Sequence, residues 1–347
     1  MSDYGIWYTT RERVVSAIDI GMPMSDRLRI DEAIEGSARA IENTYNRRFY
    51  PELRTLGLDW PSRTFGRSWR VWLPPWDEFQ SVTTLTSGGT EISSDDYILY
   101  PRNGPPYNRV EVNIGTSAAF SSGSSPQNSL QIYGLGGWSD NNPSAGSTAS
   151  SLTSSTTSVD VTDSSRIGVG TVLKISSERM VVTDRSWLTT GQTGSLTASK
   201  ASVTLAVSDG TTFFKNEILL LDSEYVYVND IVGNNLIVRR AIYGSVLADH
   251  SGSTIYAPRR LTVRRAVLGT TASSHSSPAT VLRWEPPRLA ESLNVAEAVA
   301  LFLAENSGYA RTVGSGESER ELRGNSLTDL RLQADQVYGR HIAHRAV

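Results

Sequence analysis

The sequence predicts an α+β multidomain protein in which helical segments at both ends of the chain bracket a mostly-β middle. Three observations predict this fold class. Apolar residues recur at helical spacing near both ends, apolar residues alternate with polar ones in the middle, and part of the middle is repeated. A chain of 347 residues is also too long for one ordinary core, so we expect two or three domains.

The repeat is visible in two short stretches that carry a glutamate at the same place. Residues 221–230 read LDSEYVYVND, and residues 175–184 read ISSERMVVTD, with a shift of 46 that aligns Glu224 with Glu178. A carboxylate inside an apolar stretch is either a catalytic acid, a metal ligand or a strand residue at a turn. Because both copies have it, we favour a strand residue that binds a backbone turn in each module.

A second repeat follows the first. Residues 236–250 read LIVRRAIYGSVLADH and residues 261–275 read LTVRRAVLGTTASSH, with a shift of 25. Both copies of the first repeat precede both copies of the second, whereas tandem modules would alternate. We therefore infer a nested duplication, in which an inner module at 201–257 is inserted in an outer module formed by 150–200 plus 258–283.

Four helices are expected outside the modules. The clearest covers 25–50, with an apolar face that includes Ile30, Ile34 and Ile41 and a stop at Pro51. The other three are expected at 10–19, 288–306 and 325–344. These amphipathic helices should pack together, because none can bury its apolar stripe alone.

Strand composition marks the region between the first helices and the modules. The expected strands cover 69–75, 81–92, 96–101, 107–113 and 129–133. Gly88-Gly89 predicts a hairpin turn within the second of them. The Gly- and Ser-rich stretch 134–158 that follows is typical of a linker or domain boundary.

Composition excludes several classes of protein. There is no cysteine, so neither a disulfide framework nor a thiolate metal site is expected. No apolar stretch approaches membrane-spanning length, and the first residues lack a signal-peptide pattern. The net charge of −3 favours no particular polyanionic partner.

The remaining candidate chemistry is weak. His341 and His344 could share a metal, but no carboxylate completes a site, so we interpret them as a helix end. Gly134–Gly137 and Gly314–Gly316 resemble fragments of phosphate loops and are better interpreted as a turn and a hinge. No nucleophile elbow or triad spacing is present, so we expect no enzyme, no cofactor and no metal.

One basic concentration could contact phosphate. It consists of Arg239, Arg240, Arg259, Arg260, Arg264 and Arg265. Because two of the pairs belong to the repeated motif, we favour scaffold salt bridges.

Several motifs outside the modules resemble one family in their order. A helix ending in Arg47-Arg48-Phe49 leads into WRVWLPPWDEFQSVTTLTSGGTEISSDDYILYP (69–101), then QIYGLGGW (131–138), then an Ala-rich helix after Pro286-Pro287. This order resembles bacteriophage head-to-tail connector (adaptor) proteins of long-tailed phages, over roughly 25–140 and 284–347. The modules resemble a β unit common in phage virion proteins. Their position between QIYGLGGW and the returning helix departs from the family pattern.

The resemblance implies a fold and a domain scheme. It implies a small helical bundle with a β-hairpin core, interrupted by a mostly-β insertion. The connector core would comprise 1–140 together with 284–347, and the insertion 141–283.

The resemblance also implies a function in assembly at the virion neck, after synthesis in the host cytoplasm. Such a protein forms a ring homo-oligomer, of about twelve copies by analogy with portals. The ring joins the portal protein to a stopper or tail-completion protein and extends the channel through which DNA passes without sequence-specific contact. No membrane is involved.

Two sets of residues are candidates for these contacts. The portal-docking candidates are Leu327, Leu330, Val337, Tyr338, Arg340, His341 and Arg345. The candidates for contact with a neighbouring subunit or the tail are Arg47, Arg48, Thr86, Ser87, Gly88, Gly89 and Thr90.

An alternative function stays open at this point. The chain could be a tail or baseplate protein whose β modules bind a host-surface glycan. Exposed tryptophans in the modules would favour this function, and the modules contain one tryptophan, Trp187.

Overall fold

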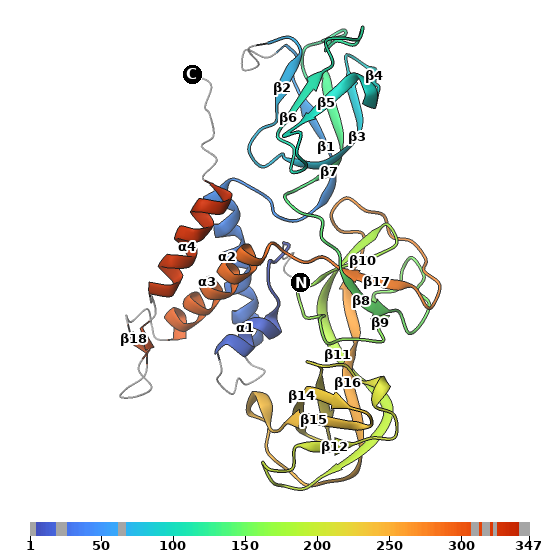
Figure 1. The fold of residues 1–347 in the computed structure, drawn as a ribbon, viewed down its shortest axis with the longest axis vertical. Coiled ribbons are helices and arrows are strands. Elements are labelled where there is room, and N and C mark those ends of the chain that lie inside the picture. Colours follow the sequence, from blue (N-terminus) through green and yellow to red (C-terminus); the bar gives the residue numbers. More distant parts are fainter. Residues whose placement is uncertain are drawn as a thin grey trace. The chain divides into compact units, whose positions relative to one another are not determined.

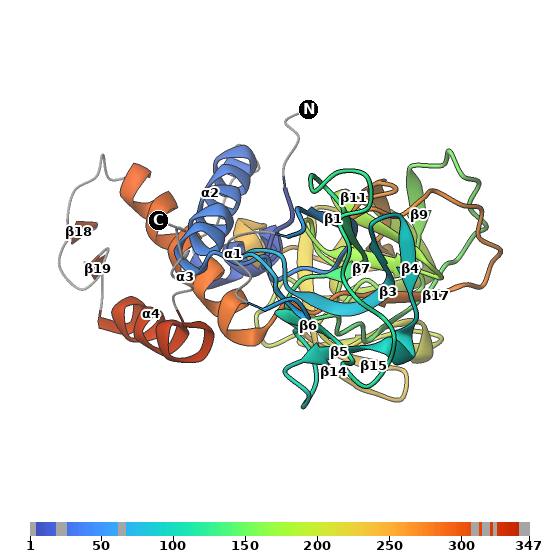
Figure 2. The ribbon, with the colours of Figure 1, turned by 90° about the horizontal axis from the view of Figure 1, so that it is seen from above.

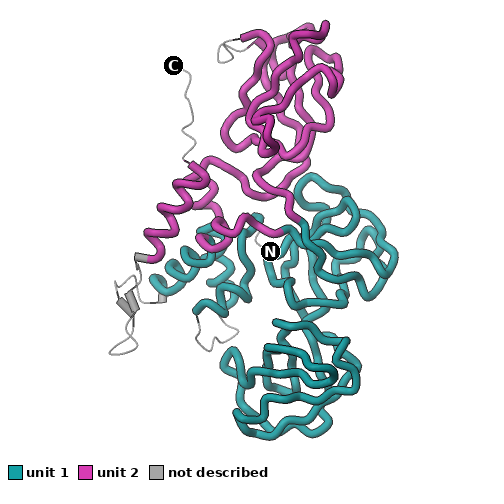
Figure 3. Tube along the Cα trace, viewed as in Figure 1, with its two compact units in different colours: residues 1–37, 142–284, 294–324 teal, residues 38–141, 285–293, 325–347 magenta. Residues whose placement is uncertain are grey.

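A computed structural model of the chain describes residues 5–18, 26–61, 67–306, 312–313, 320–321 and 325–339. The fold is mixed α+β with large antiparallel sheets, which confirms the predicted class (Figure 1). The chain forms two compact units (Figure 3). Unit 1 comprises 1–37, 142–284 and 294–324, and unit 2 comprises 38–141, 285–293 and 325–347.

A ten-stranded antiparallel sheet dominates unit 1. Its strand order is β12-β15-β14-β13-β16-β11-β10-β17-β8, with β9 paired to β16. The strands are β8 (Ser144–Ser147), β9 (Ser158–Asp160), β10 (Val172–Ile175), β11 (Glu178–Leu196), β12 (Thr204–Ala206), β13 (Ile218–Leu221), β14 (Glu224–Val232), β15 (Asn235–Arg239), β16 (His250–Arg264) and β17 (Thr280–Arg283). Strands β11 and β16 are long enough to run through the whole of this region, and bulges interrupt their pairing.

This sheet encloses two separate hydrophobic cores. One core is built from residues between 145 and 182 together with residues between 261 and 281. The other is built from residues between 196 and 257. The second core therefore lies, in chain order, inside the first. We call them the outer core and the inner core.

Three helices cover the rest of unit 1. They are α1 (Arg11–Ile18), the first part of α2 (Arg27–Tyr45) and the last part of α3 (Arg288–Asn306). Ile30 and Ile34 of α2 pack with Ala298 and Phe302 of α3, and Figure 2 shows these two helices side by side. The prediction that the helical segments pack together is confirmed here.

A buried asparagine joins these helices to the N-terminal segment. The amide nitrogen of Asn294 donates to the carbonyl of Ile34 and to the hydroxyl of Ser37, and its oxygen accepts from the backbone N–H of Tyr8. Asn294 is fully buried, so these three bonds satisfy a polar group that water cannot reach.

Unit 2 contains two small antiparallel sheets around one core. The four-stranded sheet has the order β1-β7-β3-β4 and the three-stranded sheet the order β2-β6-β5. The strands are β1 (Glu52–Leu58), β2 (Arg70–Trp72), β3 (Phe79–Ser87), β4 (Thr90–Ile92), β5 (Tyr97–Tyr100), β6 (Arg109–Val112) and β7 (Leu130–Gly136).

The hairpin at Gly88-Gly89 is confirmed, since both glycines have positive φ and Ser87 pairs with Thr90. Helix α4 (Asn325–Tyr338) and the last part of α2 also belong to this unit. Two further short strands, β18 (Thr312–Val313) and β19 (Arg320–Glu321), pair with each other.

Helix boundaries differ from the predictions in a physically simple way. Helix α3 matches its predicted range, but α2 ends at Tyr45 rather than near Pro51. Asn46 follows in the left-handed conformation, at φ 47°, which is a common helix terminator. The residues after Pro51 then form β1, which pairs along its length with β7 and which the sequence analysis did not predict. The predicted end of the last helix, residues 340–344, lies outside the described residues.

Of the two interpretations of 134–158, the linker is wrong, whereas a boundary between the two units does fall within the stretch, after Asn141. Gly134 lies within β7, and a β-carbon there would come 2.1 Å from the carbonyl oxygen of Ser81, so glycine serves close strand approach rather than a turn. Further along, β8 joins the large sheet and Leu152 is buried in the outer core. Small residues in this stretch therefore reflect tight packing and not flexibility.

The domain scheme stays a prediction. The compact units divide the chain next to the predicted boundary at 140/141, because unit 1 resumes at Asn142. They place 1–37 and 294–324 with the β modules, however, whereas the predicted scheme assigns them to the connector core.

The first testable prediction concerns the two cores. We call the part of the β structure around the inner core the inner region and the part around the outer core the outer region. Leu188 and Ala257 are cross-strand partners where β11 and β16 enter the inner region. We expect a chain lacking 189–256, with a short Gly-Asn turn in their place, to keep the outer core folded. The reason is that every buried residue of the outer core lies outside the deletion.

The folding of the outer core can be followed by amide hydrogen exchange of β10 and β17, compared between the native chain and the shortened chain. Protection of both strands at native levels agrees with two independent cores. Exchange as fast as in the urea-unfolded chain would show that the outer core depends on the inner one.

Candidate functional site

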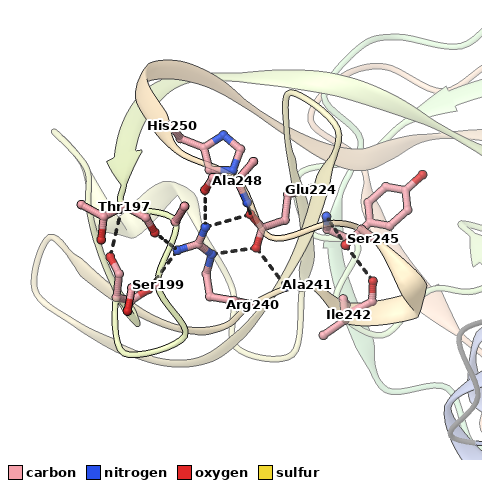
Figure 4. Close-up of polar contacts among 12 residues, drawn as sticks. Thr197, Ser199, Glu224, Arg240, Ala241, Ile242, Ser245, Ala248 and His250 are labelled. Atoms are coloured by element: carbon pink, nitrogen blue, oxygen red, sulfur yellow. Dashed lines mark hydrogen bonds and ion pairs between the residues drawn. The ribbon is translucent and has the colours of Figure 1, made fainter.

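Glu224, the first candidate acid, lies at the start of β14 immediately after a tight turn (Figure 4). Its two oxygens accept hydrogen bonds from Nε and Nη2 of Arg240, at 2.7 and 2.8 Å. They also accept from the backbone N–H groups of Ala241 and Ala248, at 2.9 and 3.0 Å. Nε2 of His250 lies 3.0 Å from the second oxygen. The carboxylate is fully buried, and every side of it is occupied.

Glu178 has the same surroundings in the outer region. Arg265 contacts it through Nε and Nη2, and Nε2 of His275 lies 2.9 Å from its second oxygen. The backbone N–H groups come from Ala266 and Ser273, at 3.3 and 3.0 Å. Each partner stands at the shift that the sequence repeat gives, 46 for the glutamates and 25 for the other residues.

These contacts fix the ionisation of both glutamates. Burial by itself would raise the pKa of Glu224, but hydrogen bonds from Arg240, His250 and the two backbone N–H groups outweigh it and hold the pKa at about 2. Glu178 has a pKa of about 2 for the same reasons, through Arg265, His275 and Ser273. A carboxylate that is ionised at neutral pH and whose oxygens are fully engaged is poorly suited to act as a general acid or a metal ligand. Both glutamates lie at the start of a strand and bind the backbone of a turn, as predicted.

The two clusters differ at one position. In the inner cluster, Nδ1 of His250 lies 2.8 Å from the carboxylate of Asp222, which also accepts from Ser253. Hydrogen bonds from Ser253 and His250 lower the pKa of Asp222. In the outer region, the residue at the position of Asp222 is Ser176.

The basic concentration is mostly used for internal ion pairs, as predicted. Besides Arg240 and Arg265, Arg259 donates to Glu217 through Nε and Nη2, both at 2.8 Å, and Arg260 pairs with Asp160. Glu217 also accepts from the hydroxyl of Ser164, at 2.7 Å, and this bond joins the inner region to the outer one.

In unit 2, Arg47 occupies the centre of a buried aromatic cluster. Its Nε and Nη2 donate to Glu78 at 2.7 and 3.0 Å, and Nη1 donates to the carbonyl of Tyr338 at 2.8 Å. The guanidinium carbon lies 3.9 Å from the ring centre of Trp138. Phe49 packs edge-on against Tyr338, with ring centres 4.7 Å apart. Arg47 is 3% exposed, so its assignment to a contact surface does not suit its position.

The other predicted contact residues are divided between surface and interior. Arg48 pairs with Glu52, Gly89 and Thr90 are exposed at the hairpin tip, and Thr86 and Gly88 are half-buried. Ser87 is buried, and its hydroxyl both donates to and accepts from the backbone of Ser121.

The predicted portal-docking residues are divided in the same way. Leu327 and Tyr338 face the interior, Leu330 is half-buried and Val337 is 61% exposed. Arg340, His341, His344 and Arg345 lie outside the described residues, as do Gly314 and Gly316.

One row of side chains on the three-stranded sheet, with an exposed tryptophan and two half-buried neighbours, was not predicted from the sequence. Trp72, Arg109 and Tyr100 are cross-strand neighbours on β2, β6 and β5. The guanidinium of Arg109 lies 4.7 Å from the ring centre of Trp72 and 4.1 Å from that of Tyr100. The buried Val71 and Val110 and the half-buried Leu99 alternate with this row, so the period-two pattern of WRVW could have identified Trp72 as outward-facing.

The described residues form neither a cluster suited to a metal nor a helix suited to span a membrane. No group of three or more His, Asp or Glu side chains in the described part of the chain could hold a metal. None of the described helices is both long and apolar enough to cross a membrane.

Comparisons with known proteins return no match: none of the family models, the curated proteins or the solved structures matches this chain. The function must therefore be argued from the residues.

The second testable prediction concerns the buried ion pair. Replacement Glu224→Gln leaves the guanidinium of Arg240, which is 2% exposed, without its counter-charge. We expect the inner region to lose roughly 3–5 kcal/mol of unfolding free energy. Urea unfolding followed by the fluorescence of Trp187 would measure this in a background where the other tryptophans are phenylalanine.

The matched control is Asp160→Asn, which removes the partner of Arg260 in an ion pair whose arginine is 47% exposed. A loss below about 1 kcal/mol is expected there. Equal losses in the two variants would contradict the assigned role of the buried cluster.

The third prediction is a loss of stability in acid. A carboxyl group whose pKa is about 2 in the folded chain, against about 4.3 when unfolded, stabilises the fold fully above the unfolded value. This stabilisation is lost as the pH falls through the folded value, and it amounts to roughly 3 kcal/mol for each of Glu178 and Glu224. We expect the urea midpoint to decrease steadily between about pH 5 and pH 2. Glu224→Gln should show a shallower dependence, and an unchanged slope would count against this assignment.

Proposed function

We propose that the protein is a structural subunit of the head-to-tail junction of a bacteriophage, acting by assembly into a ring. In this proposal the ring joins the portal protein to a stopper or tail-completion protein, and DNA passes through its lumen. The proposal rests on the order of motifs in the sequence, and the geometry of unit 2 supports it.

The observation that carries the proposal is that the residues of the resemblance meet in one cluster. Arg47 and Phe49 end the first motif, Glu78 stands in the second and Trp138 closes the third. In the structure they surround Tyr338 of the last helix. Motifs separated by most of the chain would have no reason to converge if their order were accidental.

The row Trp72–Arg109–Tyr100 offers a place for a protein contact. Trp72 is 44% exposed, and Trp, Tyr and Arg are the residue types that dominate binding energy at interfaces. Stacking also holds the arginine in one conformation, which lowers the entropy lost on binding. A ring requires a heterologous interface, so this row would meet a different surface of the neighbouring subunit.

Helix α4 has the amphipathic character of a docking element. Leu327, Ala334 and Tyr338 are buried, whereas Leu332 and Val337 are 57% and 61% exposed. Exposed apolar side chains on a helix are costly in water and gain from burial against a partner. We assign portal docking to this outer face, with Val337 from the predicted set.

The β region would brace the junction, and we interpret it as a nested pair of modules. Support comes from the two buried clusters, in which each atom-level contact of Glu224 has a counterpart at Glu178. The inner core also lies between the two sequence segments of the outer core. An insertion of one copy into a loop of the other accounts for both observations.

The fourth prediction tests assembly. We expect native mass spectrometry and negative-stain imaging to show a ring, either of the purified chain or of the chain mixed with the portal protein of the same phage. A trimer, or a monomer that ignores the portal, would contradict the proposed function.

The contact row has its own variant. Trp72→Ser should weaken ring formation by about tenfold or more, because an exposed tryptophan at an interface is a frequent hot spot. Val232→Ser, at a position 62% exposed in unit 1, is the matched control and should leave the ring intact. If the ring still forms with Trp72→Ser, the subunit interface lies on another surface, and the assembly proposal itself is not contradicted.

A further inference from the structure

A cavity of about 520 Å³ lies within unit 1, between helices α1 and α2 and the two β regions. Its lining includes Val15 and Ile30 from the helices, Trp187 from β11, and Ile218 and Tyr225 from β13 and β14. The volume falls in the range of small-molecule sites in proteins. The assembly role proposed above does not use this cavity.

The charged groups at the cavity are paired with one another. Arg11 donates to Asp31 through Nε at 2.7 Å and through Nη2, and Arg185 contacts Glu12 at 3.2 Å. Glu12 also accepts from the backbone N–H of Val169. Arg27 and Asp184 also line the cavity, so its three arginines stand against the three carboxylates of Glu12, Asp31 and Asp184. With the charges balanced, the site offers little net attraction to a phosphate or another strong anion.

Several uncharged polar groups at the cavity, unlike the charged ones, lack a partner in the described part of the chain. Within the described residues, the indole N–H of Trp187 and the hydroxyls of Tyr225, Tyr243 and Ser223 have no hydrogen-bond partner in the protein, although all four residues line the cavity. Burial, with the nearby carboxylate of Glu12, raises the pKa of Tyr243, so its phenol stays protonated at neutral pH. The cavity therefore presents neutral donors and acceptors.

Aromatic surface stands beside these groups. The rings of Trp187 and Tyr225 stack with their centres 5.5 Å apart and their planes at 16°. Both residues are half-buried, so part of each ring faces the cavity or solvent. Aromatic side chains with a polar tip can contact the C–H surface of a ligand and bind its hydroxyls at the same time.

Tyr243 is held in place by a backbone that tyrosine rarely adopts. Its φ and ψ are 53° and 34°, in the left-handed region between Ala241 and Gly244, which also have positive φ. Such a conformation is unfavourable for any residue with a β-carbon and persists only where the surroundings impose it. Here the bonds from Ala241 and Arg240 to Glu224 fix the turn that carries the tyrosine.

We propose that this cavity binds a neutral sugar unit, such as one residue of a glycan. The paired charges disfavour an anion, and the four unpartnered N–H and O–H groups match a ligand rich in hydroxyls. The stacked rings match its apolar C–H face. This binding site goes beyond the assembly role and holds whether or not the chain forms a ring.

The test is binding of methyl glycosides of glucose, galactose, mannose and N-acetylglucosamine to the full chain, with glucuronate as the anionic probe. Saturation-transfer NMR detects binding, and titration of the ligand signals gives the dissociation constant. We expect at least one neutral glycoside to bind and glucuronate to bind more weakly. Absence of binding by all four neutral probes, or stronger binding of glucuronate, would overturn the proposal.

Variants locate the site. Tyr243→Phe removes one hydroxyl that has no partner in the described chain, and should weaken binding about three- to tenfold. Trp187→Leu removes a stacking ring and should weaken it about tenfold or more. Tyr256→Phe, at a 37% exposed tyrosine away from the cavity lining, is the matched control and should bind like the native chain.

Trp187→Leu removes packing as well as a ligand contact, so Ser223→Tyr provides a second blocking variant. Ser223 is exposed in a turn and lines the cavity, so a large side chain there fills space without disturbing a core. Loss of binding in Ser223→Tyr and weaker binding in Tyr243→Phe, with Tyr256→Phe unchanged, support the assignment. Native affinity in both variants would overturn it.

Discussion

The fold of the β region depends on a carboxylate that has been taken completely out of water. A buried glutamate is tolerated only when its charge and all of its lone pairs are matched, since its desolvation otherwise costs several kcal/mol. At Glu224 this condition fixes the fork of Arg240, the ring of His250 and two backbone N–H groups of the following loop. The loop can reach those positions only with residues in the left-handed conformation, which is why Ala241, Tyr243 and Gly244 all have positive φ. These polar contacts fix the path of the loop together with the burial of Ile242.

Buried ion pairs between arginine and glutamate also join other segments that are distant in sequence. Arg47 joins Glu78 and the end of α4 in unit 2, and Arg259 joins Glu217 to the outer region in unit 1. A chain without cysteine cannot use disulfides for this purpose. Buried guanidinium–carboxylate pairs add little net stability compared with apolar packing, but they are directional, and misregistered alternatives leave a charge unpaired. The pairs therefore favour one arrangement of the chain over others.

Local and repeated patterns could be predicted from the sequence, whereas single contacts between distant residues could not. Helix α3 was predicted over its full length from apolar spacing, and the repeat indicated separately that Glu224 is structural and that the arginine pairs form scaffold salt bridges. That Glu224 and Arg240 bind each other came only from the structure. Composition misled at 134–158, because glycine that permits close strand approach looks the same as glycine in a flexible linker. Arg47 looked like a surface residue, since its partners Glu78 and Tyr338 lie 31 and 291 residues away. The cavity could not be predicted for the same reason, because its lining comes from α1, α2 and both β regions.

The internal repeat allows the two copies to be compared position by position. Residues that both copies share belong to the scaffold, whereas residues that differ can serve a role in one copy alone. The shared positions are those of the buried cluster, and they extend to Ser245 and Thr270, whose hydroxyls accept from the backbone N–H of Tyr225 and Arg179. Two of the positions that differ lie at the cavity. Tyr225 corresponds to Arg179 of the outer copy and Tyr243 to Leu268, although the backbone at each pair is alike, with φ 53° at Tyr243 and 57° at Leu268. A left-handed turn that holds a leucine in one copy presents a phenol in the other. The strain at this position therefore belongs to the scaffold, and the hydroxyl is what the inner copy adds to the cavity.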